Sequence, residues 1–62
     1  MIGNNIKKLR EINNLTQEDL AKECGVTYQA VSKWENNRCI PKVDIIKKLS
    51  KIFNVNINDI IN

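Results

Sequence analysis

The chain has 62 residues and a net charge of +3, from ten Lys and Arg against seven Asp and Glu, with two cysteines and no histidine. A chain of this length forms one domain, residues 1–62, with a thin core, and it has no apolar run long enough to cross a membrane. Without histidine it lacks an imidazole base and a mixed Cys/His zinc site, so we expect no enzyme and no metal or cofactor.

The two cysteines, Cys24 and Cys39, do not form a CxxC pair. No signal peptide precedes them, so we expect both to be reduced, in a cytoplasmic protein. The small positive charge suits an anionic partner such as nucleic acid, although many other proteins share it.

Apolar residues at spacings of three and four predict a first helix. Its stripe consists of Ile2, Ile6, Leu9 and Ile12. After Asn13 and Asn14 interrupt this pattern, Thr16 is a good N-cap for a second helix, and Asp19 completes a pattern like a capping box. The inward face of this second helix consists of Leu20, Ala21 and Cys24. Gly25 ends it, because a left-handed residue is needed there.

Thr27 is the predicted N-cap of a third helix, which has two different faces. The inward face consists of Ala30, Val31 and Trp34. The outward face consists of Tyr28, Gln29, Ser32 and Lys33. A helix that only packed against a core would have little use for these polar groups in its first turn, so we expect them to contact a partner.

Two further helices follow Pro41, which resists helix continuation before it. The fourth is the most hydrophobic of the chain, with Val43, Ile45, Ile46, Leu49, Ile52 and Phe53. The fifth is short, with Asn56 as its cap, Asp59 at the capping-box position, and the apolar residues Ile57, Ile60 and Ile61. No segment requires a β-strand, so we predict an all-α domain of five short helices around one core.

The second and third helices, about eight residues each and joined through Gly25 and Val26, have the form of a helix-turn-helix. Ala21 must be small because the two helix backbones cross closely there. Such pairs also occur in proteins that never touch nucleic acid, so the motif alone is only moderately specific.

The run LTQEDLAKECGVTYQAVSKWENNR closely resembles the helix-turn-helix of the phage repressor and Cro-type proteins, the XRE family. IGNNIKKLREINN is similar to the first helix of that family, and PKVDIIKKLSKIFNVNINDII is similar to its fourth and fifth. The resemblance covers essentially the whole chain. It implies a compact, lambda repressor-like domain and a regulator of transcription, a repressor, that binds double-stranded DNA sequence-specifically with its third helix in the major groove.

The resemblance also implies which residues contact DNA. Gln29 matches a position that reads bases and can bond bidentately to adenine, while Lys33 can reach guanine or a phosphate. Tyr28 can meet a thymine methyl, a phosphate or only water, and Ser32 is a further candidate for a base contact. The expected contacts to the DNA backbone are Gln17, Thr27, Asn36, Arg38 and Lys42.

Arg10 and Glu35 match positions at which the family places an ion pair that ties the first helix to the third. The chain departs from the family at Asn14 and Asn37, where glycine is common, and we expect a positive φ at both. Lys42 replaces a better N-cap, so either Asp44 compensates or the fourth helix frays.

The resemblance implies a homodimer on a palindromic operator, in the cytoplasm of a bacterium or encoded by a phage. We expect the dimer to form through Ile57, Ile60 and Ile61, unless these residues simply close the core. No small-molecule ligand and no membrane is implied. The alternative is a protein-interaction module on the same scaffold, such as the antitoxin of a toxin–antitoxin pair; the polar, uncharged or positive face of the third helix favours DNA.

Overall fold

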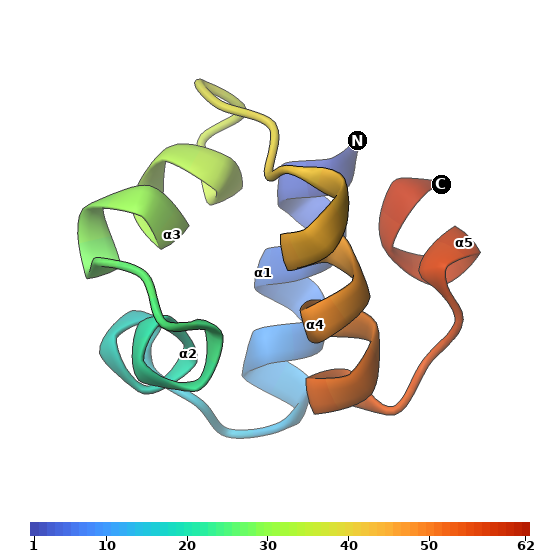
Figure 1. The fold of residues 1–62 in the computed structure, drawn as a ribbon, viewed down its shortest axis with the longest axis horizontal. Helices are drawn as coiled ribbons and strands as arrows, with labels where there is room; N and C mark the ends of the chain where they lie inside the picture. Colours follow the sequence, from blue (N-terminus) through green and yellow to red (C-terminus); the bar gives the residue numbers. More distant parts are fainter.

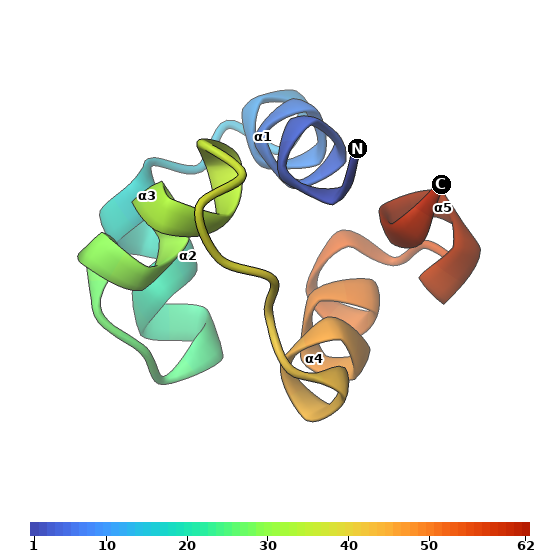
Figure 2. The ribbon, with the colours of Figure 1, turned by 90° about the horizontal axis from the view of Figure 1, so that it is seen from above.

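A computed structural model describes residues 1–62 and contains five helices and no strand (Figure 1). The helices are α1 (Ile2–Ile12), α2 (Gln17–Cys24), α3 (Tyr28–Glu35), α4 (Val43–Phe53) and α5 (Ile57–Ile61). Both views place α2 and α3 on one side of the molecule and α5 on the opposite side, with α1 and α4 between them (Figures 1 and 2). The predicted all-α, five-helix architecture is confirmed. None of the helices combines the length and the apolar character that a membrane span needs.

Ten buried apolar side chains from all five helices form the core, and they anchor the helix-turn-helix to the rest of the domain. They are Ile6, Leu20, Ala21, Cys24, Val31, Trp34, Ile46, Leu49, Phe53 and Ile60. The prediction that Trp34 belongs to the core is confirmed, since 5% of it is exposed. Cys24 is buried, whereas Cys39 is exposed, and both are free thiols.

Two apolar residues of the predicted helices lie outside the core, and one residue considered for a dimer surface lies inside it. Ile12 and Val43 are 65% and 69% exposed, because each lies at a helix end where no other element covers it. Ile60 is fully buried, so it closes the core and cannot contribute to a dimer surface. For Ile60, the alternative expectation, that it closes the core, is therefore confirmed.

Capping explains why the short helices α2 and α3 begin where they do. The Thr16 hydroxyl accepts from the backbone N–H of Asp19 at 3.0 Å, and the Asp19 carboxylate accepts from the backbone N–H of Thr16 at 2.9 Å. The Thr27 hydroxyl accepts from the backbone N–H of Ala30 at 3.3 Å. At α4, Lys42 is the N-cap and supplies no side-chain bond, and Asp44 is the acidic residue of the first turn. The caps formed by Thr16 and Thr27 satisfy backbone N–H groups that have no partner within their own helix.

The capping box makes the stability of the domain depend on pH. Hydrogen bonds from the backbone and side chain of Thr16 lower the pKa of Asp19 below its usual value. Because the unfolded chain then holds the proton more tightly than the folded one, this contribution is present above a pH of about 4 and is lost as the pH falls through the lowered pKa. We expect Asp19→Asn to reduce the acid dependence of the unfolding free energy, measured by urea titration between acidic and neutral pH. An unchanged dependence would contradict this role.

Four helices end with a residue in the left-handed conformation. The residues are Asn14, Gly25, Asn37 and Asn54, with φ between 56° and 72°. At Asn37, for example, its N–H donates to the Trp34 carbonyl at 3.0 Å and the next N–H, of Arg38, donates to the Lys33 carbonyl at 2.9 Å. This is the Schellman arrangement, and it satisfies the last carbonyl groups of the helix. The predicted positive φ at Asn14 and Asn37 is confirmed, while that at Asn54 was not predicted.

Asn37 offers a direct test of this conformation. We expect Asn37→Gly to be tolerated far better than Asn37→Val, because a β-branched side chain at φ 58° adds strain that glycine avoids. Both variants lose the bond in which the Asn37 side chain accepts from the Gly3 N–H at 3.2 Å, so their difference isolates the backbone term. Thermal melting of the two variants measures it, and equal melting temperatures would count against the strain.

Candidate nucleic-acid interface

The helix-turn-helix consists of α2, α3 and the three residues between them. Gly25, at φ 72°, turns the chain, and half-buried Val26 packs against the core. Ala21 is 4% exposed in α2, consistent with a close crossing of the two helices. The start of α3 is thereby held in a fixed position relative to the core.

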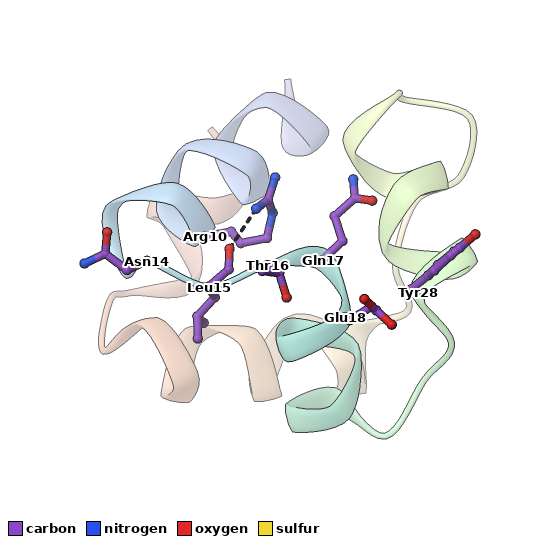
Figure 3. A pocket seen from close by; sticks show the side chains of 7 residues that line it. All are labelled: Arg10, Asn14, Leu15, Thr16, Gln17, Glu18 and Tyr28. Atoms are coloured by element: carbon purple, nitrogen blue, oxygen red, sulfur yellow. Dashed lines mark hydrogen bonds between the residues drawn. The ribbon is translucent and has the colours of Figure 1, made fainter.

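A network of hydrogen bonds around Glu35 joins α1, α2 and α3. Arg10 donates to both Glu35 oxygens, from Nε at 2.7 Å and from Nη2 at 3.1 Å. Its Nη1 donates to the Leu15 carbonyl at 2.7 Å, the bond drawn in Figure 3. The Arg10 and Glu35 side chains are 12% and 3% exposed. The hydrogen bond to Glu35 raises the pKa of Arg10. The predicted ion pair is present in the structure and tethers the end of α3 to α1.

Gln17 belongs to the same network, which the sequence did not indicate. Its Nε2 donates to Glu35 Oε1 at 3.1 Å, so one amide hydrogen points into the protein. The second amide hydrogen of Nε2 has no partner within the chain. Gln17 also opens α2, where backbone N–H groups lack intrahelical partners. It can therefore present donors to an anion while its side chain stays held by Glu35.

The outward face of α3 presents the residues expected to read bases. Tyr28 is 45% exposed, and Gln29 and Lys33 are also exposed. Ser32 is only half-buried, and its hydroxyl accepts from the Asn36 side chain at 3.4 Å. The structure therefore brings Tyr28 and Gln29 together at the start of the helix, with Lys33 one turn later and Ser32 nearer its edge.

The residues expected to grip the DNA backbone flank this helix at both ends. Thr27 caps its start, while Asn36, Arg38 and Lys42 are exposed along the connection from α3 to α4. The Asn36 side chain also donates to the Ser32 carbonyl at 2.8 Å and so covers the end of α3. Arg38 and Lys42 form no ion pair within the chain, which leaves both charges available to an anion.

Two hollows border the first turn of α3. The larger, of about 620 Å³, is lined by Arg10, Asn14, Leu15, Thr16, Gln17, Glu18 and Tyr28 (Figure 3). The smaller, of about 270 Å³, is lined by Glu18, Ala21, Lys22, Val26, Tyr28 and Gln29. Glu18 and Tyr28 line both. The sequence did not single out Glu18, although its place as the second residue of α2, beside Gln17, could have indicated it.

The site contains no group of three Cys, Asp or Glu side chains that could hold a metal ion. What it offers is a convex row of amide, phenol and ammonium groups on one helix, flanked by cationic side chains. Groups of these kinds are able to donate hydrogen bonds to an anionic or polar partner.

Comparison with known proteins places this arrangement in a family. A model of the helix-turn-helix family matches residues 6–60. The chain is 42% identical over 57 residues to the uncharacterized HTH-type transcriptional regulator MJ0272 of Methanocaldococcus jannaschii, covering 92% of this chain and 86% of that protein. It is 39% identical over 57 residues to the HTH-type transcriptional activator BcrR of Enterococcus faecalis, covering 92% of this chain but only 28% of BcrR.

Among solved structures, the master regulator for biofilm formation SinR in complex with DNA superposes with a TM-score of 0.91 at 27% identity, covering all of both chains. The likeness therefore extends over the whole fold as well as over the motif. This protein belongs to the helix-turn-helix family.

Proposed function

We propose that this chain is the DNA-binding domain of a transcriptional regulator that docks α3 in the major groove of a palindromic operator. The observation that carries the proposal is the exposed polar start of α3, held against the core by the Glu35 network. Similarity to a regulator whose structure was solved with DNA supports it. Occupation of an operator by itself blocks other proteins, so repression, in the cytoplasm where the DNA lies, is the regulatory role we assign.

In this proposal each exposed side chain of α3 has a stated partner. The Gln29 amide bonds to N6 and N7 of an adenine, and the Lys33 ammonium donates to the acceptors of a guanine. The Tyr28 ring lies against a thymine methyl, and Ser32, at the edge of the face, makes the outermost base contact. Ser32 ranks last of the four, because it is half-buried whereas Tyr28, Gln29 and Lys33 are exposed.

The flanking residues hold the domain on the phosphates. Gln17 uses its second amide hydrogen and the start of α2, where backbone N–H groups favour an anion. Thr27, at the start of α3, makes a further phosphate contact. Beyond the end of α3, the phosphate contacts come from Asn36, Arg38 and Lys42. These contacts fix the position of the domain on the duplex and do not discriminate sequence.

We also propose that the protein binds as a homodimer. The recognition helices of a symmetric pair lie about 34 Å apart. This separation exceeds the longest extent of one copy, 24 Å, so each of the two helices would belong to a separate copy. Of the predicted dimer residues, Ile57 and Ile61 are 37% and 45% exposed. Ile61 borders an apolar hollow of about 290 Å³ with Met1 and Ile40, which extends the available surface beyond α5.

The rival proposal, a protein-interaction module or antitoxin, uses the same exposed helix. It is less well supported, because α3 exposes no carboxylate and only Tyr28 among large apolar side chains. A module that bound a protein through this face would instead need a larger apolar patch.

Titration of fluorescent duplexes at several salt concentrations tests DNA binding. With Arg38 and Lys42 each neutralising a phosphate, the logarithm of the affinity should fall with the logarithm of the salt concentration at a slope of about −2 per copy. A protein that shows no binding to any duplex at low salt would refute the proposal.

Two variants distinguish contacts to DNA bases from contacts to the DNA phosphates. We expect Gln29→Ala to relax the preference at one base pair, by about 1–3 kcal/mol. Arg38→Ala should weaken all sequences alike and make the salt slope shallower by about one. The measurement is selection of duplexes from a random pool, followed by titration. If Gln29→Ala keeps the parent preference at every position, Gln29 does not read a base.

A further inference from the structure

Glu18 is the one carboxylate of the candidate interface without a partner inside the chain. Asp19 accepts from the backbone of Thr16 at 2.9 Å, and Glu35 accepts from Arg10 and Gln17. Glu18 is exposed, and the only ion pair in the chain joins Arg10 to Glu35. Its charge is therefore not neutralised by any contact within the protein.

The position of Glu18 places that charge where DNA would lie. It follows Gln17 in the first turn of α2 and lines the larger hollow together with Tyr28 (Figure 3). It lines the smaller hollow as well. One hollow also contains Gln17, the proposed phosphate contact, and the other contains Gln29, the proposed base contact. A duplex that touches both residues must pass close to the Glu18 carboxylate.

We infer that Glu18 limits the affinity of this domain for DNA by repelling a phosphate beside Gln17. This inference rests on the proposed function. Lys22 also lines the smaller hollow, but it forms no ion pair with Glu18. The exposed cations assigned to the interface are Lys33, Arg38 and Lys42, so one opposing charge removes a substantial part of the attraction. Since phosphates are present in every sequence, the repulsion weakens operator and random DNA alike and shortens the time spent on both.

A structural role for Glu18 predicts a different result. A carboxylate in the first turn stabilises a helix by its favourable interaction with the helix dipole. If this is the role of Glu18, Glu18→Gln should slightly lower the melting temperature. Such a role leaves DNA affinity unchanged or reduced. An increase in affinity is therefore specific to the repulsion.

The test compares Glu18→Gln with Glu23→Gln, using a duplex selected from a random pool and a scrambled duplex. Glu23 is also exposed on α2 but lines neither hollow, and its substitution changes the net charge equally. We expect Glu18→Gln to bind both duplexes about three to ten times more tightly than the parent at low salt, and Glu23→Gln to change binding less than twofold. The gain should shrink as salt screens the charge.

Three results would overturn the inference while leaving DNA binding intact. They are equal gains for the two variants, no gain for Glu18→Gln, and a gain confined to the selected duplex. Failure of the parent protein to bind either duplex would instead refute the proposed function itself.

Discussion

Arg10→Met should lower the free energy of unfolding by about 3–5 kcal/mol, because it leaves the buried Glu35 carboxylate with one hydrogen bond, from Gln17, in place of three. A domain of 62 residues has a total stability of only about 3–9 kcal/mol. The variant is therefore expected to melt at a markedly lower temperature than the parent. The paired arrangement itself need not be strongly stabilising, since the loss comes from the uncompensated charge.

A double-mutant cycle separates these two effects. We expect Arg10→Met combined with Glu35→Gln to melt at a higher temperature than Arg10→Met alone, because the buried charge is then absent. Urea titration of the parent, both single variants and the double variant gives the coupling energy. A cycle without coupling would mean that the contact at 2.7 Å does not govern the stability of this region.

Gly3→Ala is the second substitution with a large expected effect. A Cβ at Gly3 would collide with the Trp34 carbonyl oxygen and lie 2.5 Å from Asn37 Oδ1, so the backbones of α1 and α3 would have to separate. The shift would also weaken the bond from the Gly3 N–H to Asn37. Alanine is favoured over glycine in a helix by about 1 kcal/mol, yet we expect a net loss of more than about 2 kcal/mol.

Gly25→Ala is the matched control for this substitution. A Cβ there meets no atom within 4 Å, and only the left-handed φ of 72° opposes it. Its expected loss is about 1–2 kcal/mol, the strain of a non-glycine residue in this conformation. Denaturant titration compares the two variants, and a Gly3→Ala variant as stable as the parent would show that α1 and α3 are not in such close contact.

Local chemistry in the sequence was enough to predict the five helices. Thr16, Asp19 and Thr27 form the caps expected of them, and Gly25 ends α2 as predicted, because these signals act over three or four residues. Asn54 followed the same rule as Asn14 and could have been predicted from its place directly after the apolar stripe of α4.

The features that the sequence did not predict are those that depend on which helices pack against each other. Periodicity assigns both Ile12 and Ile60 to an apolar face. Ile60 is buried because α5 packs on α1 and α4, whereas Ile12 stays exposed at the end of α1. Nothing near Gly3 in the chain indicates that a carbonyl from α3 approaches it. Both features arise from contacts between residues far apart in sequence.

The candidate site was also predicted only in part. Resemblance to the family indicated Gln29, Lys33 and the pair of Arg10 with Glu35. The bond from Gln17 to Glu35 and the exposed position of Glu18 between two hollows emerged only once α2 and α3 were placed. Both bear on how tightly the domain would hold a phosphate.

The most direct test of the central claim, that the start of α3 reads DNA sequence, is the ratio of affinities for a selected and a scrambled duplex at one salt concentration. Two base contacts worth about 1–3 kcal/mol each predict a ratio of at least about thirty for one half-site. Equal affinities for the two duplexes would contradict the claim and leave only binding to the phosphate backbone.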